Sequence, residues 1–381
     1  MSKNVSLNER NHRSDVWVGM LLLGCAALSL LLSNSSWGEF YQMIWKISIG
    51  GHPLAHWIDD GLMAVFFLSV GLELKREVLM GKLSSPSRAL LPVAAAVGGM
   101  LLPAVLYLLL NYGNSTSVGF GIPMSTDIAF VLGVLALLGK IIPHSLKVFL
   151  MALAVVDDLG AIVVIAVFYT SEFHLMYFLS ALLLTLLLYC MGRWMRTYSP
   201  WVYVFGGIVL WLLVMRSGIH ASIAGILLAL AVPSSGPDAP LIRWERRLHT
   251  PVYYVVLPLF VLANTAVPLR AEAFAHLFDA HSLGIMLGLL VGKPVGILLS
   301  TWIVTIFGWT TLPEGVGWWH IVGGGFLGGI GFTMAIFVTL LSFENPLLVD
   351  SSKLAIFLAS LTAMLAGAAV LWWAGKRRYA R

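Results

Sequence analysis

The chain has 381 residues, of which 59% are hydrophobic and only 11% are charged, and its mean hydropathy is +0.90. This composition excludes a water-soluble globule. The net charge of +5 is spread over many short connections rather than gathered in one basic patch, so nucleic acid is not an expected partner.

Apolar stretches of about 20 residues, the length that spans a bilayer, recur twelve times along the chain. They begin near Val16, Leu54, Ala89, Val118, Leu146, Leu175, Trp201, Gly218, Pro251, Ser282, Trp318 and Leu354. The longest expected connection runs from Pro233 to Thr250. The sequence therefore predicts an all-α polytopic membrane protein, with residues 1–381 in a single integral domain and no soluble domain.

Charges in the connections predict the orientation of these spans. With the N-terminus placed inside, eighteen Lys and Arg residues fall on the inner side and four on the outer side. The positive-inside rule then indicates an even number of spans with both termini in the cytoplasm. The second span closes on charged residues, Glu73 with Lys75, Arg76 and Glu77, which a solvated helix end would explain.

The fourth predicted span contains a stretch that is poor as a continuous helix. It reads GFGIPMST from Gly119 to Thr126, and Asp127 follows it directly. Irregular backbone at membrane depth is tolerated only where it is buried in protein or lines a cavity. Asp127 is expected to cap the helix that follows, to bind a cation beside unwound carbonyls, or to do both.

Two neighbouring aspartates, Asp157 and Asp158, lie in the middle of the fifth predicted span. A carboxylate at the bilayer centre costs roughly 2.5–3.5 kcal/mol on insertion scales, so such residues persist mainly where they function. On a helix the two side chains point about 100° apart. We expect one to face a cavity and bind a cation, and the other to have a partner or carry a proton.

Two later polar residues are weaker candidates. His220, within MRSGIHASIAG, is either a pH-titrating group or a satisfied packing residue. Glu245, within RWERRLH, is expected to pair with neighbouring arginines.

Lys293, in the tenth predicted span, is the only lysine expected within the membrane and the expected partner of the paired aspartates. A static ion pair that aids assembly is the alternative. Three buried carboxylates against one lysine leave excess negative charge, which a cation or protons must neutralise. Asp158, Asp127 and Thr126 offer oxygens that suit Na⁺ or Li⁺, although ligand type alone does not exclude Ca²⁺ or Mg²⁺.

The eleventh predicted span carries a second weak point, GGGFLGGIG from Gly323 to Gly331. Close helix packing explains most membrane glycines. However, the two weak points fall at corresponding places in the two halves of the chain. That arrangement is typical of inverted-topology repeats with two broken helices crossing near the membrane midplane.

Together these residues resemble the NhaA family of bacterial Na⁺/H⁺ antiporters, over nearly the whole chain. The resemblance rests on WIDDGLMAVFFLSVGLELKREV from Trp57, PMSTDIAFVLGVLALLG from Pro123, KVFLMALAVVDDLGAIVVIAVFYT from Lys147, SGIHASIAG from Ser217, LPLFVLANTAV from Leu257, GLLVGKPVGI from Gly288 and GGIGFTMAIF from Gly328. It implies electrogenic export of Na⁺ or Li⁺ in exchange for protons by alternating access. It also implies a role in sodium and pH homeostasis, the bacterial inner membrane, no cofactor and often a homodimer.

For individual residues, the resemblance implies that Asp158 and Asp127 are the principal cation and proton carriers and that Asp157 lies in the same site. Lys293 would pair with Asp157 and balance the dipoles of the two broken helices, and Thr126 would lie in the unwound segment. A pH response is implied for Glu73, His220 and Glu245.

Two other functions stay open at this point. Asp127 and Asp158, on different helices, imitate the two carboxyls of an intramembrane aspartyl protease, although the GxGD signature is absent. A cation channel without proton coupling is the other alternative. The chain contains no GxxxxGK[ST] loop for ATP, so we expect a secondary transporter rather than an enzyme.

Overall fold

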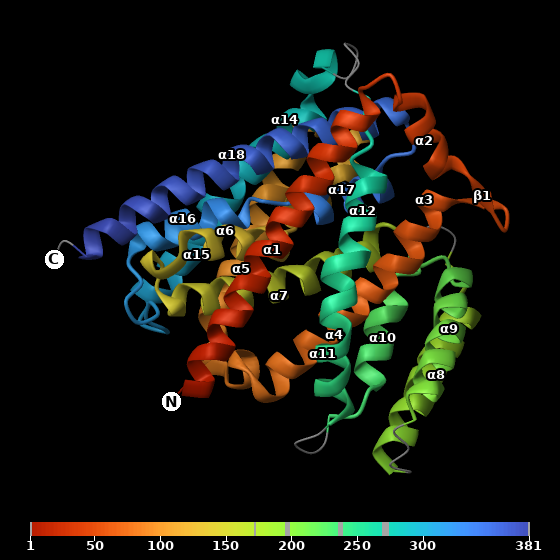
Figure 1. The fold of residues 1–381 in the computed structure, drawn as a ribbon, viewed down its shortest axis with the longest axis horizontal. Coiled ribbons are helices and arrows are strands. Elements are labelled where there is room, and N and C mark those ends of the chain that lie inside the picture. Colours follow the sequence, from red (N-terminus) through yellow and green to blue (C-terminus); the bar gives the residue numbers. More distant parts are fainter. Residues whose placement is uncertain (1, 171–172, 195–198, 235–238, 269–273, 380–381) are drawn as a thin grey trace. The chain divides into compact units, whose positions relative to one another are not determined.

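A computed structural model gives the structure of the protein and describes residues 2–170, 173–194, 199–234, 239–268 and 274–379. Nearly all of the described regular structure is helical (Figure 1). The strands within these ranges are Ser48–Ile49 (β1) and His52–Pro53 (β2), which pair as a short antiparallel hairpin. The predicted all-α architecture is confirmed, apart from this hairpin.

The chain folds into two compact units, each built from separate segments. The first unit comprises residues 1–38, 85–161 and 264–381, and the second comprises residues 39–84 and 162–263. Helix α7 (His144–Phe168) begins in the first unit and ends in the second.

The first unit contains most of the long helices and both predicted breaks. Its elements besides α7 are α1 (Ser2–Ser33), α5 (Pro86–Leu110), η3 (Ser115–Met124), α6 (Ile128–Leu138), η4 (Gly139–Ile141), η6 (His276–Phe278), α14 (Ala280–Leu287), η7 (Gly288–Gly292), α15 (Lys293–Ile306), α16 (Trp318–Gly328), α17 (Phe332–Ser342) and α18 (Pro346–Tyr379).

Glycines set the closest helix contact in the first unit. Helices α5 and α15 approach so closely at Gly98 and Gly296 that a Cβ on Gly296 would lie 2.1 Å from the Gly98 carbonyl oxygen. Small residues at such contacts let membrane helices pack backbone to backbone. This packing holds Lys293, the first residue of α15, at a fixed place beside α5.

The second unit contains shorter helices around α4. Its elements are α2 (Gly38–Lys46), β1, β2, α3 (Leu54–Trp57), η1 (Ile58–Leu62), α4 (Met63–Met80), η2 (Lys82–Ser84), α8 (Leu175–Trp194), α9 (Pro200–Arg216), α10 (Ile223–Ala231), α11 (Pro240–Pro251), η5 (Val252–Val256) and α12 (Leu257–Asn264). Helix α10 packs on α4, where a Cβ on Gly225 would lie 2.1 Å from the Ala64 carbonyl oxygen. Helices α8 and α9 lie side by side (Figure 1).

Both predicted breaks exist, and the second is shorter than predicted. In the fourth predicted span, η3 runs as a 3₁₀ helix to Met124, and α6 begins only after Asp127. In the eleventh, the glycines from Gly323 to Gly328 are helical, and α16 and α17 meet at a bend of 44°. The glycines of α16 contact α7, α15 and α18, so close packing explains most of the run and only its last three residues interrupt the helix.

Helices occupy all twelve predicted stretches, but not all are long membrane spans. Among the described residues, seven helices are long and apolar enough to cross a bilayer, or eight when α16 and α17 count as one bent span. The others are shorter or end in charges, as α10 and α4 do. The predicted connection from Pro233 to Thr250 contains helix α11, which begins at Pro240 and is not among the candidate spans.

Candidate ion-binding site

The two helix breaks meet in the first unit. The Asp127 backbone N–H donates to the Ile330 carbonyl oxygen at 2.6 Å. The Thr126 hydroxyl lies 2.8 Å from the Gly328 carbonyl oxygen, to which it can donate. Each break therefore supplies polar backbone groups to the other, which satisfies groups that would otherwise be costly to bury.

Lys293 and Asp157 form a fully buried ion pair beside these breaks. The Lys293 Nζ lies 2.6 Å from Asp157 Oδ2, and both side chains are 0% exposed. Lys293 also donates to the carbonyl oxygen of Met124, the last residue of η3. The ammonium thus balances the negative C-terminal end of η3 as well as the carboxylate. The pairing of Lys293 with Asp157 is confirmed.

Thr126 connects this pair to the second break. Its hydroxyl oxygen lies 2.6 Å from Asp157 Oδ2, the same oxygen that Lys293 contacts. One hydroxyl has a single proton to donate, so Thr126 can donate to Asp157 or to the Gly328 carbonyl oxygen, but not fully to both.

Asp127 lies at the N-terminal ends of two half-helices. Its Oδ1 accepts from the Phe130 N–H at 3.3 Å, which caps α6. Its Oδ2 accepts from both the backbone N–H and the hydroxyl of Thr333, in the first turn of α17. The capping role considered from the sequence is confirmed. Thr333 was not identified from the sequence, where the only signal was a hydroxyl residue directly after the glycine-rich run.

Asp158 follows Asp157 on α7 and is 2% exposed. Its charge acts on the Lys293 ammonium. Among the described residues, Asp157 and Asp158 thus lie with the buried Lys293 on one side of the site, and Asp127 lies at the adjoining helix break. The positive ends of two half-helices offset part of the charge on Asp127.

Several oxygen atoms that were predicted to bind the cation are instead engaged in hydrogen bonds within the protein. The Thr126 hydroxyl is directed at Asp157 and the Gly328 carbonyl, and the Asp127 carboxylate accepts three protein hydrogen bonds. Coordination of Na⁺ by Asp158, Asp127 and Thr126 stays a prediction. Among the described residues, no three His, Cys, Asp or Glu side chains are placed to hold a resident metal ion.

The second unit brings together two of the three residues predicted to respond to pH. Arg76 Nε contacts Glu245 Oε1 at 2.8 Å, and Arg76 also pairs with Glu77. Glu73 lies at the charged end of α4, which is outside the candidate spans. Burial, reinforced by the negative charge of Glu245, raises the pKa of Glu73 to about 7. Burial also raises the pKa of Glu245.

Two features of this cluster differ from the sequence-based expectation. Glu245 forms its ion pair with Arg76 on α4 rather than with an arginine of its own segment. Lys75 donates to the carbonyl oxygens of Leu230 and Val232, at 2.6 Å each, and so holds the C-terminal end of α10 against α4. Burial lowers the pKa of Lys75 to about 8.

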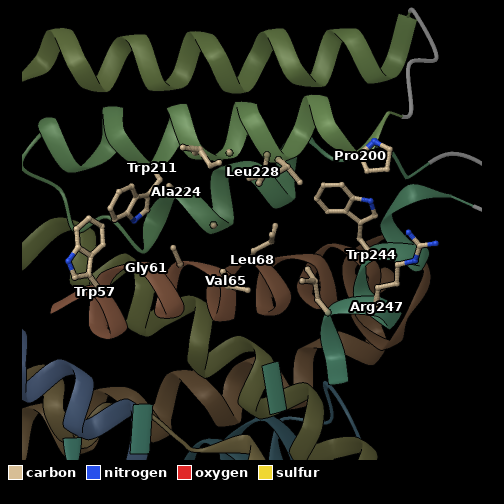
Figure 2. A pocket seen from close by; sticks show the side chains of 16 residues that line it. Trp57, Gly61, Val65, Leu68, Pro200, Trp211, Ala224, Leu228, Trp244 and Arg247 are labelled. Atoms are coloured by element: carbon tan, nitrogen blue, oxygen red, sulfur yellow. The ribbon is translucent and has the colours of Figure 1, made fainter. Parts of the chain in front are cut away.

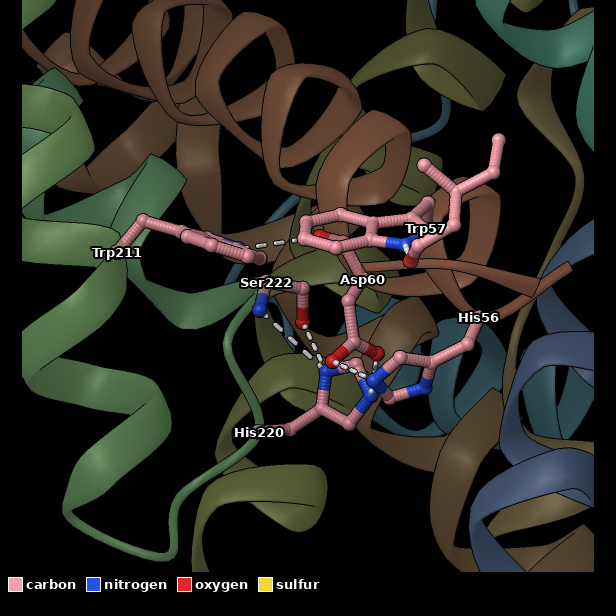
Figure 3. A network of polar contacts seen from close by, with 7 residues as sticks. His56, Trp57, Asp60, Trp211, His220 and Ser222 are labelled. Carbon is pink, nitrogen blue, oxygen red and sulfur yellow. Dashed lines mark hydrogen bonds and ion pairs between the residues drawn. The ribbon is translucent and has the colours of Figure 1, made fainter. Parts of the chain in front are cut away.

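His220 lies in a separate network with Asp60 of η1 (Figure 3). Its Nδ1 accepts from the Ser222 N–H at 3.3 Å, and its Nε2 lies 3.3 Å from Asp60 Oδ1. His56 approaches the other oxygen of Asp60 at 3.6 Å. The Trp211 indole N–H donates to the Asp60 carbonyl oxygen. The structure thus separates His220 from the pair formed by Glu73 and Glu245.

The second unit also contains an open apolar cavity of about 600 Å³ (Figure 2). Trp57, Trp211 and Trp244 line it, and Arg247 contributes its only charged side chain. None of the predicted ion-site or pH-response residues lines this cavity.

Sequence relationships agree with this geometry. The family described as Na⁺/H⁺ antiporter 1 matches residues 9–371. The Na(+)/H(+) antiporter NhaA of Dechloromonas aromatica is 50% identical and aligns over 93% of this chain and 92% of its own length. The Na(+)/H(+) antiporter NhaA 1 of Flavobacterium johnsoniae is 47% identical over 92% of each chain. The antiporter NhaA of Vibrio alginolyticus is 44% identical over 93% of this chain and 94% of its own. With this match over residues 9–371 and these identities over nearly the whole of each chain, the protein belongs to the Na⁺/H⁺ antiporter 1 family.

Proposed function

We propose that the protein exports Na⁺ or Li⁺ in exchange for protons by alternating access, and that each cycle moves net charge. The observation that best supports this proposal is the buried Lys293–Asp157 pair, which lies where two broken helices meet and next to Asp158. A fixed structural pair would require no second carboxylate beside it.

The charge count explains why cation and proton would exchange. Lys293 neutralises one carboxylate, and the remaining buried negative charge needs a cation or protons to balance it. Na⁺ and H⁺ bind the same carboxylate oxygens, so one displaces the other. Asp158 is the proposed principal carrier, with Asp127, Asp157 and Thr126 in the same site.

The regulatory part of the proposal concerns the second unit. Glu245 pairs with Arg76 of α4, and its negative charge acts on the nearby Glu73 carboxyl, so protonation of the two acids would alter the contact between α4 and α11 near neutral pH. His220, held against Asp60, is the third proposed pH-responsive group. We further propose a homodimer in the bacterial inner membrane, with both termini in the cytoplasm and no cofactor.

Everted membrane vesicles provide the test. Respiration acidifies the vesicle lumen, and addition of Na⁺ should collapse the pH gradient when wild-type protein is present. Asp158→Asn should abolish this collapse. Asp279→Asn, which changes an exposed acid paired with His276, is the matched control and should behave as wild type.

Each other result would reject part of the proposal. Sodium-dependent proton movement by Asp158→Asn would exclude that residue as the principal carrier. Sodium flux in wild type without proton movement would indicate a channel. Absence of any flux, with cleavage of a membrane peptide that requires Asp127 and Asp158, would indicate a protease.

A further inference from the structure

An open apolar groove lies between the neighbouring helices α15 and α16 in the first unit. Its volume is about 660 Å³. Both helices belong to candidate membrane spans, so this surface faces hydrocarbon when the protein is in a bilayer. The groove is lined only by apolar and aromatic side chains, which include Val295, Leu298, Leu299, Trp302, Trp318 and Trp319.

Helix α18 carries two cations near its C-terminal end, and one of them, Arg377, contacts the tryptophan that packs against the groove wall. The Trp319 ring packs edge-on against Trp373, with centroids 5.1 Å apart. The Arg377 guanidinium lies 3.8 Å from the centroid of the Trp373 ring, and Lys376 lies 3.9 Å from that of Trp372. One end of the groove is therefore formed by the Trp319 ring, which packs on Trp373, and the positive charge of Arg377 lies on the Trp373 ring.

Neither of these two cations forms an ion pair with an acid in the part of the chain that the structure describes. Both side chains are exposed, and no described carboxylate lies within ion-pair distance of either one. Their contacts are with tryptophan faces, which attract cations but leave the positive charge uncompensated. An anion can therefore bind here without displacing a protein partner.

We propose that this groove binds an anionic phospholipid, with one acyl chain between α15 and α16 and its phosphate at Arg377 and Lys376. Tryptophan side chains concentrate at the depth of lipid headgroups, as Trp302, Trp318 and Trp319 would do here. Each Lys or Arg near an anionic membrane surface strengthens attraction appreciably. A purely apolar groove has no hydrogen-bonding group for a polar ligand. An anionic lipid, in contrast, can place its acyl chain in the groove and its phosphate against the cations.

Lipid titration by native mass spectrometry tests the proposal, with palmitoyl-oleoyl phosphatidylglycerol as the anionic probe and the matching phosphatidylcholine as the neutral one. Wild type should retain one tightly bound phosphatidylglycerol per protomer. Lys376→Gln/Arg377→Gln should weaken that site about thirtyfold, since each lost cation contributes about a fivefold share. Phosphatidylcholine binding should not change between the two proteins.

A second pair of cations provides the matched control. Arg88→Gln/Arg193→Gln removes the same charge from exposed helix ends that line no part of this groove. This control should retain the tight site. Equal weakening by both double variants would show only a general electrostatic effect and would overturn the proposal. Equal affinity of wild type for both lipids would overturn it as well.

A groove-filling variant tests the acyl-chain part separately. Leu299→Trp places bulk in the groove from an exposed position on α15, whereas Ile303→Trp adds the same bulk four residues away, outside the lining. Expulsion of about two methylenes should weaken phosphatidylglycerol binding about tenfold in Leu299→Trp. Ile303→Trp should bind as wild type, and unchanged binding by Leu299→Trp would place the lipid elsewhere.

Discussion

At the scale of single residues, the buried ion pair of Lys293 and Asp157 has a direct consequence for the stability of the protein. Lys293 is surrounded by Asp157, the Met124 carbonyl and the charge of Asp158, with no access to water. Removing one partner of such a pair leaves an uncompensated buried charge, which typically costs about 3–5 kcal/mol. Lys293→Ala should therefore lower the melting temperature of the purified protein strongly.

The partner substitution shows whether this loss comes from charge. Asp157→Asn/Lys293→Ala removes both charges and should recover a large part of the stability lost in Lys293→Ala, as measured by thermal unfolding in detergent. If the double variant melts no higher than the single one, the loss comes from packing, and the ion-pair explanation fails.

Glu73 predicts a pH dependence of stability at the end of α4. Its pKa is raised from the ordinary value of 4.5 to about 7, so the folded protein binds this proton more tightly than the unfolded chain between these pH values. The free energy of unfolding therefore falls as pH rises from about 4.5 to 7. Glu73→Gln should remove this decline, which we estimate at roughly 2 kcal/mol after allowing for partial screening.

Melting temperatures between pH 5 and 8 check this prediction, with Glu39→Gln as a control because Glu39 is exposed and lies on α2, away from the cluster. The wild-type and Glu39→Gln curves should decline together toward pH 7, while the Glu73→Gln curve stays flatter. Parallel curves for all three proteins would contradict a buried, titrating Glu73.

At the scale of elements, the contact between α5 and α15 positions Lys293. A Cβ on Gly98 would lie 2.4 Å from both the Gly296 carbonyl oxygen and the Ser300 hydroxyl, so Gly98→Ala must separate the two helices. Overpacking of this kind costs about 1–3 kcal/mol. Gly24→Ala on α1 is the control, because a Cβ there meets nothing within 4 Å. A clear fall in melting temperature is expected for Gly98→Ala only, and equal values would show that the helices adjust freely.

The sequence predicts elements well and their partners poorly. Runs of apolar residues locate the spans, and glycine with proline reveals the two weak points, because both signals are local. The exact extent of each break depends on packing, since Gly323 to Gly328 stay helical where neighbouring helices enclose them. The contact between Thr333 and Asp127 joins residues 206 positions apart, and no spacing rule predicts it. Arg76 with Glu245 is a second pair of this kind.

At the scale of the whole molecule, the question is whether the exchange cycle carries charge. Among the described residues of the first unit, the buried carboxylates outnumber the one buried lysine, Lys293. A second acid can therefore take up a proton in addition to the proton that replaces Na⁺. Exchange of two protons for one Na⁺ moves one net charge per cycle. A membrane potential then contributes about 2.3 kcal/mol per 100 mV to the export of Na⁺.

This stoichiometry predicts a measurable balance point in proteoliposomes. With no pH difference, an inside-negative potential of 100 mV set with valinomycin and K⁺ should sustain a Na⁺ gradient of about fiftyfold, outside over inside, because 2.3 kcal/mol equals that ratio. One-for-one exchange would sustain none, whatever the potential. Asp158→Asn proteoliposomes define the leak. A Na⁺ gradient that does not change with the membrane potential would mean that only one acid exchanges its proton. A second of the three aspartates would then act as a fixed charge. Asp127 is suited to that role, because it caps both half-helices.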